Sequence, residues 1–168
     1  MKRSQFIKAA GGSALVLAAT PLLSFGHPLL NDPQLDKELV QTFVGKAHSD
    51  MDMVKELLAE HPTLLNAAHD WKFGDFETAL GAASHVGHKD LAQFLLDQGA
   101  QANIFTAALF GKLEIVKHML EAFPSTLHVK GPHGFTLLHH AEKGGEEALK
   151  VVEYLKKLGA TEGKIKLY

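Results

Sequence analysis

Histidine is the residue type in this chain with the broadest chemical capacity, because the sequence contains 11 histidines and no cysteine. A neutral imidazole is the commonest metal ligand in proteins and also titrates near physiological pH. The densest group of possible ligands is a loop histidine followed by a helix-borne pair and an acid: His133, His139, His140 and Glu142. Consecutive residues of a helix point about 100° apart, which works against joint ligation by His139 and His140. We therefore expect neither a metal nor a cofactor.

Other signatures of catalysis are absent from the sequence. It contains no nucleophile elbow, no phosphate-cradling glycine loop and no zinc-protease helix. The lack of cysteine excludes thiol catalysis, thiolate zinc sites and disulfides. We expect a protein that is not an enzyme. The alternative is a small metal-binding or hydrolytic protein that uses the region of His133, His139 and His140.

Residues 70–77 (DWKFGDFE) combine three aromatic and three acidic side chains in one short segment. Exposed aromatic side chains are costly in water and common at the hot spots of interfaces. We expect Trp71, Phe73, Asp75 and Phe76 to bind a partner, so that Trp71→Ala and Phe73→Ala leave the thermal unfolding temperature nearly unchanged. For Trp71 and Phe73, local packing against neighbouring loops is an equally open alternative, and for Phe76 it is the favoured one.

The elements that position these residues follow from a repeated helical pattern. Four segments carry a small turn residue, a helical apolar stripe and a large apolar finish, at positions 49–58, 87–96, 111–120 and 144–155. In the third segment Leu113, Val116 and Leu120 fall on one helical face, while the charged residues lie elsewhere on the wheel. Such a stripe is hidden from water only when neighbouring helical pairs stack.

A longer period lies over the shorter one. An offset of 62 residues relates Val54, Leu57, Leu58 and Pro62 to Val116, Met119, Leu120 and Pro124. The first and third segments end at these prolines, which lack an N–H and stop a helix. The second and fourth end in Gly99-Ala100 and Gly159-Ala160, where glycine suits the left-handed residue that closes a helix. The pattern predicts two double units.

Two of these segments resemble the ankyrin repeat, whose pattern is T-P-L-H-x-A-A-x-x-G-H, then paired aliphatic residues, then L-L-x-x-G-A-D-x-N. Residues 78–88 read TALGAASHVGH and are followed by Leu95-Leu96, Gly99-Ala100 and Asn103. The fourth copy reads GFTLLHHA over residues 134–141 and has two extra residues after it. The third copy has lost most of its hairpin, and the first keeps only its second helix clearly.

The resemblance covers residues 36–161 and implies an all-α fold, an ankyrin-repeat solenoid of about four stacked helix-turn-helix units. It also implies structural roles for residues that could otherwise be assigned to a site. His88 and His139 would tie backbone groups between neighbouring turns. The hydroxyls of Thr78 and Thr136 would cap helix starts.

A protein–protein interaction module is the function that the resemblance implies, with a protein or peptide partner bound through the loops and the inner helices. The further partner-binding candidates are His85, Phe105, Phe110, His133 and Phe135, which with the aromatic segment would form one aromatic and histidine-rich face. A rigid stack lowers the ordering cost of binding. We expect a monomer and a partner that is not acidic.

Residues 1–26 follow the grammar of an export signal peptide, because the basic residues Lys2, Arg3 and Lys8 precede an uncharged run that continues to residue 26. The start resembles the twin-arginine signature, with Ser4 in place of the second arginine, so the twin-arginine and general secretory routes both stay open. The run is short and is broken by glycine and proline. We expect cleavage, no stable membrane anchor, and a periplasmic or secreted protein; a buried amphipathic helix is the alternative.

The remaining chain divides into a linker (27–35), the repeat domain (36–161) and a C-terminal tail (162–168). Once the leader is removed, 14 Lys and Arg residues face 19 Asp and Glu residues. Nucleic-acid recognition depends on clustered cations that release counterions from phosphates. We therefore expect no nucleic-acid partner, and the partner protein or peptide is unidentified.

Overall fold

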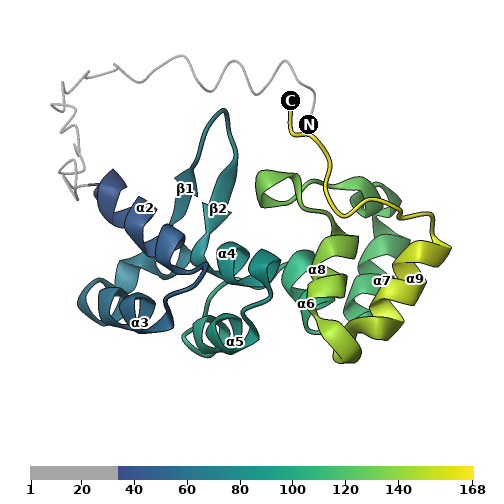
Figure 1. Cartoon of the computed structure of the whole chain (residues 1–168), viewed down its shortest axis with the longest axis horizontal. Coiled ribbons are helices and arrows are strands. Elements are labelled where there is room, and N and C mark those ends of the chain that lie inside the picture. Colours follow the sequence, from purple (N-terminus) through teal and green to yellow (C-terminus); the bar gives the residue numbers. More distant parts are fainter. Residues whose placement is uncertain (1–33) are drawn as a thin grey trace, which may run out of the picture. The chain divides into compact units, whose positions relative to one another are not determined.

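Four pairs of helices succeed one another in the computed structural model, which describes residues 34–168 (Figure 1). We call them repeats one to four. They are α2 (Lys37–Lys46) with α3 (Met51–Glu60), α4 (Ala79–Val86) with α5 (Lys89–Asp97), α6 (Ile104–Leu109) with α7 (Leu113–Ala122), and α8 (Leu137–Lys143) with α9 (Leu149–Lys157). The leader (1–26) and most of the linker (27–35) lie outside the described residues, so their boundaries stay predictions. Within residues 34–168, no helix has the length and apolar character needed to cross a membrane.

The first helices of the pairs form a continuous row. Helix α4 packs against α2 and α6, and α6 packs against α8. Each of these four helices begins at a side-chain N-cap, namely Asp36, Thr78, Asn103 and Thr136. As expected, Thr78 Oγ1 accepts a hydrogen bond from Gly81 N (3.1 Å) and Thr136 Oγ1 accepts one from His139 N (3.3 Å). The expected solenoid of stacked helix pairs is confirmed.

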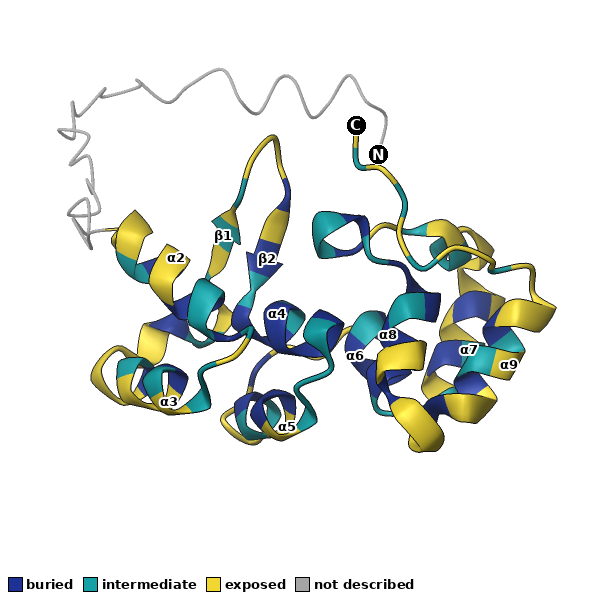
Figure 2. Ribbon diagram, viewed as in Figure 1, coloured by how far each residue is buried: buried dark blue, intermediate teal, exposed yellow. Residues whose placement is uncertain are grey.

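The apolar core is divided into two clusters of buried residues. Figure 2 shows the buried residues in dark blue along the helices. One cluster lies mainly in repeats one and two, and the other in repeats three and four. The same elements recur in each half, because α3 is followed by a 3-10 helix η1 (Pro62–Asn66) and α7 by η2 (Pro124–His128). The predicted pair of double units, 62 residues apart, is therefore present in both the elements and the core.

The connections between the pairs differ in length. Between α3 and α4 stands a hairpin of β1 (Ala68–Asp70) and β2 (Phe76–Thr78), paired antiparallel with Ala68 opposite Thr78. This small sheet is an addition to the expected all-α architecture. Between α5 and α6 there are only residues 98–103, as expected for a repeat that has lost its hairpin. The α7–α8 connection contains the turn η3 (Pro132–Gly134), and this turn contacts α4 of repeat two.

The ends of repeats two and four close as expected. Gly99 and Gly159 have φ values of 95° and 101°, the left-handed conformation that favours glycine. The two extra residues of repeat four belong to a short 3-10 turn, η4 (Gly145–Ala148). The C-terminal tail packs on the loop of repeat four, where Ile165 N donates to Gly134 O (2.8 Å).

The backbones of repeats three and four come into close contact at Gly111. Its φ is 63°, and a Cβ at this position would overlap the backbone carbonyl of Glu147. Gly145 has a similar φ of 66° but open space around it. We predict that Gly111→Ala lowers the free energy of unfolding by about 3 kcal/mol and that Gly145→Ala lowers it by about 1 kcal/mol, measured by urea denaturation. Equal losses for the two variants would contradict the close backbone contact.

Candidate functional site

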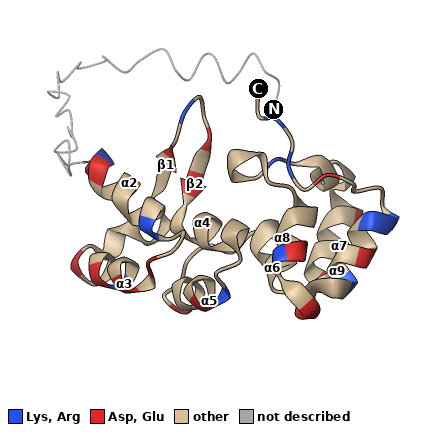
Figure 3. Ribbon diagram, viewed as in Figure 1, with Lys and Arg blue, Asp and Glu red and all other residues tan. Residues whose placement is uncertain are grey.

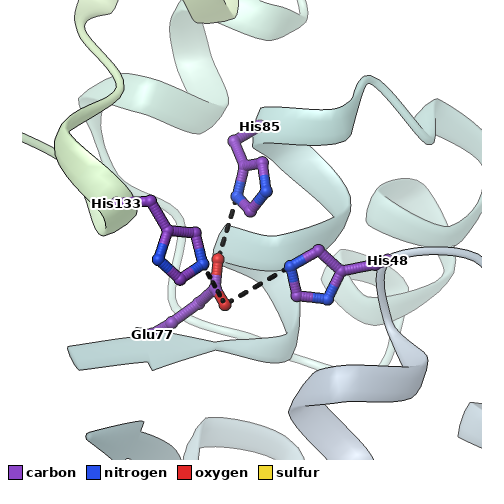
Figure 4. A group of neighbouring side chains, drawn as sticks. All are labelled: His48, Glu77, His85 and His133. Atoms are coloured by element: carbon purple, nitrogen blue, oxygen red, sulfur yellow. Dashed lines mark ion pairs between the residues drawn. The ribbon is translucent and has the colours of Figure 1, made fainter. Parts of the chain in front are cut away.

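A buried carboxylate, that of Glu77 on β2, lies where three repeats meet (Figure 4). The side chain is 1% exposed. Three imidazoles surround it: His48 from the turn between α2 and α3, His85 from α4, and His133 from η3. We call these four residues the Glu77 cluster.

The contacts within the cluster are short. His85 Nδ1 lies 2.9 Å from Glu77 Oε1, while the Nε2 atoms of His133 and His48 lie 3.3 Å and 3.5 Å from Oε2. The indole Nε1 of Trp71 also donates a hydrogen bond to Oε2 (2.7 Å). Both oxygens of Glu77 therefore face nitrogen atoms.

The far side of two of the imidazoles is fixed by hydrogen bonds. His133 Nδ1 lies 2.7 Å from Asp75 Oδ2, and the backbone N of His133 donates to Asp75 Oδ1 (2.8 Å). His48 Nδ1 lies 3.0 Å from Gly45 O. A carbonyl or an ionised carboxylate only accepts hydrogen bonds, so Nδ1 of each imidazole carries a proton. In the neutral form of either ring, the Nε2 lone pair is then directed at Glu77.

His133 reaches the cluster through an unusual backbone conformation. Its φ is 57°, in the left-handed region that residues other than glycine seldom adopt. Such a conformation costs about 1 kcal/mol or more and persists when surrounding contacts over-determine it. Here the Asp75 carboxylate holds the residue in place, because it accepts hydrogen bonds from the backbone N–H and from Nδ1 of His133. The turn is thus shaped around the position of this imidazole.

Glu77 is a carboxylate at neutral pH. Burial is the largest single influence and by itself would raise the pKa of Glu77. The interactions with His85, Trp71 and His133 outweigh burial, so the pKa of Glu77 lies below its usual value. Oε1 and His85 Nδ1 are nevertheless not aligned for a hydrogen bond, and neither atom has a hydrogen-bond partner among the described residues.

The group of possible ligands that the alternative interpretation of the sequence would use, His133, His139, His140 and Glu142, is not brought together in the structure. His139 Nε2 is hydrogen-bonded to His85 O (2.8 Å), which confirms the backbone-tying role implied for this residue. His140 Nδ1 is bonded to Thr136 O (2.7 Å), and Glu142 pairs with Lys156 on the surface. Only His133 of that group belongs to the Glu77 cluster, because its loop turns toward repeat two.

The hairpin candidates separate into exposed and buried residues. Phe73 is 88% exposed and Phe76 is 61% exposed, so the packed position favoured for Phe76 was wrong. Trp71 is half-buried against the core of repeats one and two. Asp75 is buried and supports His133. Only the two phenylalanines of this segment offer large accessible apolar surfaces.

The inner-helix candidates also separate. His85 is buried in the Glu77 cluster, and Phe135 stacks on its ring with centroids 4.8 Å apart. Phe105 packs against His140 (4.8 Å). Phe110 instead lines an apolar pocket with residues of α5 and α7, including Leu96 and Met119. The expected single face that would include Phe110 is therefore not formed.

The sequence interpretation missed two members of the site, His48 and Glu77. Nothing in the first repeat singles out His48, because the repeat keeps only its second helix clearly. Glu77 was visible as one acid among three in residues 70–77. Only the alternation of the hairpin, which buries Glu77 while Phe76 stays exposed, gives a local signal.

Comparison with protein families supports the repeat assignment. The model for ankyrin repeats, in three copies, matches residues 22–165. The chain therefore belongs to the ankyrin repeat family, whose members are typically non-enzymatic modules for protein–protein interaction. A comparison with curated proteins finds no match.

Trp71 provides a first test of the site. Because the indole packs on the core and bonds to Glu77, Trp71→Ala is expected to lower the free energy of unfolding by about 2 kcal/mol, in place of the unchanged stability expected from the sequence. Thermal and urea unfolding measure the loss. Trp71→Phe, which keeps the ring but removes the N–H, should lose about half as much. An unfolding temperature of Trp71→Ala equal to that of the wild type would show that the indole is not part of the core.

His140 provides a test by pH. Its ring is fully buried, and burial lowers the pKa of His140 from 6.5 to about 4. A histidine with a lowered folded-state pKa contributes stability that is complete above about pH 6.5 and is lost as the pH falls toward 4. We predict that His140→Leu reduces the loss of unfolding free energy between pH 7 and pH 5 by about 2 kcal/mol. The control is His118→Gln, which changes an exposed histidine. If His140→Leu lost as much unfolding free energy between pH 7 and pH 5 as this control, the buried neutral imidazole would be contradicted.

Proposed function

We propose that this chain binds a protein or peptide partner outside the cytoplasm through the tip of the repeat-two hairpin and the adjacent C-terminal tail. Membership of a family of interaction modules supports the class of function. The observation that carries the proposal is Phe73, a phenylalanine that is 88% exposed at the end of the hairpin.

Phe73 also adopts a backbone conformation that is unfavourable for a residue other than glycine. Asp75 N donates to Lys72 O (3.1 Å) across the turn, and Phe73 and Gly74 have φ values of 53° and 84°. Two consecutive residues with positive φ define the type of hairpin turn that favours Asn-Gly. A phenylalanine at the first position therefore destabilises the turn and exposes a large apolar ring to water. Both features cost the fold free energy, which favours a role in binding.

Other side chains extend this surface. The Tyr168 ring lies 5.6 Å from the Phe73 ring between centroids and is 63% exposed. Phe76, also exposed, lies on the same hairpin. We call Phe73, Phe76 and Tyr168 the hairpin surface. Three exposed aromatic rings fit the apolar side chains of an extended peptide or a protein loop.

Lysines adjoin the hairpin surface. Lys72, Lys164 and Lys166 line a pocket of about 480 Å³ between the hairpin and the tail. Figure 3 shows acidic residues on both arms of the hairpin, with basic residues at its tip and on the tail. The charge of the three lysines favours a partner that offers a carboxylate beside its apolar side chains, in contrast to the partner without acidic character expected from the sequence.

The location outside the cytoplasm rests on the composition of residues 1–26. A basic start followed by an uncharged apolar run is the pattern of an export signal. Crosslinking and affinity capture from the extracytoplasmic fraction of the native cell test both halves of the proposal, because the chain and its partner must be recovered there together. Recovery of the chain with an uncleaved leader from the cytoplasm alone would contradict the location.

Phe73→Asn separates binding from stability. The substitution creates the Asn-Gly turn that the backbone favours, so we expect it to raise the free energy of unfolding by about 0.5 kcal/mol while weakening partner capture about tenfold or more. Phe123, a 63% exposed phenylalanine at the end of α7, is the matched control as Phe123→Asn and should leave capture unchanged. Equal capture by wild type and Phe73→Asn would remove the hairpin surface as the contact.

A further inference from the structure

We propose that the Glu77 cluster binds one divalent transition-metal ion of the zinc type. The ligands are His48 Nε2, His85 Nδ1, His133 Nε2 and a carboxylate oxygen of Glu77. This proposal does not rest on the proposed function, because none of these four residues belongs to the hairpin surface of Phe73, Phe76 and Tyr168.

The spacing of the donor atoms fits such an ion. All four donors lie within 4.8 Å of one another. In a tetrahedral zinc site with bonds of about 2.1 Å, the ligand atoms stand about 3.4 Å apart. The N···O contacts of 2.9, 3.3 and 3.5 Å already bracket that value. A separation at the 4.8 Å limit reaches the tetrahedral value when the two ligand atoms approach each other by about 1.4 Å.

Hydrogen bonds to Nδ1 orient the rings of His133 and His48. With Nδ1 of His133 and of His48 bonded to oxygen, each neutral ring directs an Nε2 lone pair at Glu77. A lone pair and a carboxylate repel each other unless a proton or a metal cation lies between them. An imidazole whose second nitrogen donates to a carboxylate or a carbonyl is the usual arrangement around a protein-bound metal. Asp75 and Gly45 O provide these outer contacts here.

Two buried atoms of the cluster supply an independent indication. Glu77 is 1% exposed and His85 is 5% exposed, yet Oε1 and Nδ1 have no hydrogen-bond partner in the described part of the chain. A buried polar atom without a partner is costly, because it has lost its hydrogen bonds to water. A shared metal ion would satisfy both atoms at once. Their 2.9 Å separation without hydrogen-bond alignment suits two ligands of one ion.

The donor set also selects the class of metal. Three imidazole nitrogens and one carboxylate oxygen suit zinc, nickel, copper or iron, whereas calcium and magnesium prefer oxygen ligands. Four protein ligands make a closed site, which is typical of structural rather than catalytic zinc. The side chains of His48 and His133 are each 27% exposed, so an ion can reach the cluster from solvent. Once bound, it would connect repeats one, two and four.

The test uses the full chain after removal of metals by a chelator. Titration with Zn²⁺ is followed by calorimetry, and Co²⁺ serves as a spectroscopic probe of coordination. We expect one equivalent of Zn²⁺, intense visible absorption typical of four-coordinate Co²⁺, and a rise of about 5 °C in the thermal unfolding temperature with excess Zn²⁺. Substoichiometric binding, or a weak six-coordinate Co²⁺ spectrum, would overturn the proposal; in that case protons alone compensate the carboxylate.

Variants distinguish the cluster from the other histidines. His133→Asn retains a residue that tolerates positive φ, and we expect Zn²⁺ affinity to fall about 100-fold in this variant and further in His48→Asn/His133→Asn. Circular dichroism verifies that both variants fold. The control is His61→Asn/His118→Asn, which changes two exposed histidines outside the cluster and should bind as the wild type does. If the control lost Zn²⁺ binding, or if the cluster variants bound Zn²⁺ as the wild type does, the binding would be adventitious surface binding only.

Discussion

A carboxylate buried to 1% exposure must be compensated by its surroundings, and in this protein the compensation for Glu77 comes from three different repeats. Removing an unpaired charge from water costs far more than a single contact returns. The turn of repeat one, the first helix of repeat two and the loop of repeat four are therefore constrained together. A stack of repeats ordinarily joins only neighbours. In this protein repeats two and four are also in contact, through the packing of α4 against α8, the His139 bond to His85 O, and the Glu77 cluster.

The short connection that leads into repeat three allows repeats two and four to come into contact. Because only residues 98–103 join α5 to α6, no hairpin stands between the loop of repeat four and the hairpin of repeat two. Gly81 occupies the position where the repeat pattern has histidine, and Pro132 of the loop lies 3.5 Å from where its Cβ would stand. A large side chain at position 81 would meet that proline. Loss of one hairpin and of one side chain thus permits contact between non-adjacent repeats.

The sequence predicted what depends on local periodicity and failed where repeats meet. The stripe of Val116 and Leu120, the caps at Thr78 and Thr136, and the closing Gly99 all follow from spacing and residue type, and all are found. The Glu77 cluster could not be predicted in this way, because His48, Glu77 and His133 are far apart in sequence and converge only through stacking. The exposure of Phe76 was also missed, since alternation along a three-residue strand is too short a signal.

Both proposed sites involve the hairpin of repeat two, but they differ in their physical character. The hairpin surface is accessible, apolar and held in a costly turn, whereas the Glu77 cluster below it is buried and polar. The hairpin surface suits a binding partner, and the Glu77 cluster holds the hairpin that carries this surface.

The coupling free energy between Glu77 and His133 tests this connection most directly. A double-mutant cycle of Glu77→Gln and His133→Asn, measured by urea unfolding in the presence of a chelator, isolates their interaction from every other contact. We expect a coupling of at least about 1 kcal/mol, because the two side chains lie 3.3 Å apart and one of them is fully buried. Additive effects, with a coupling indistinguishable from zero, would contradict the claim that the buried carboxylate holds repeat four against repeat two.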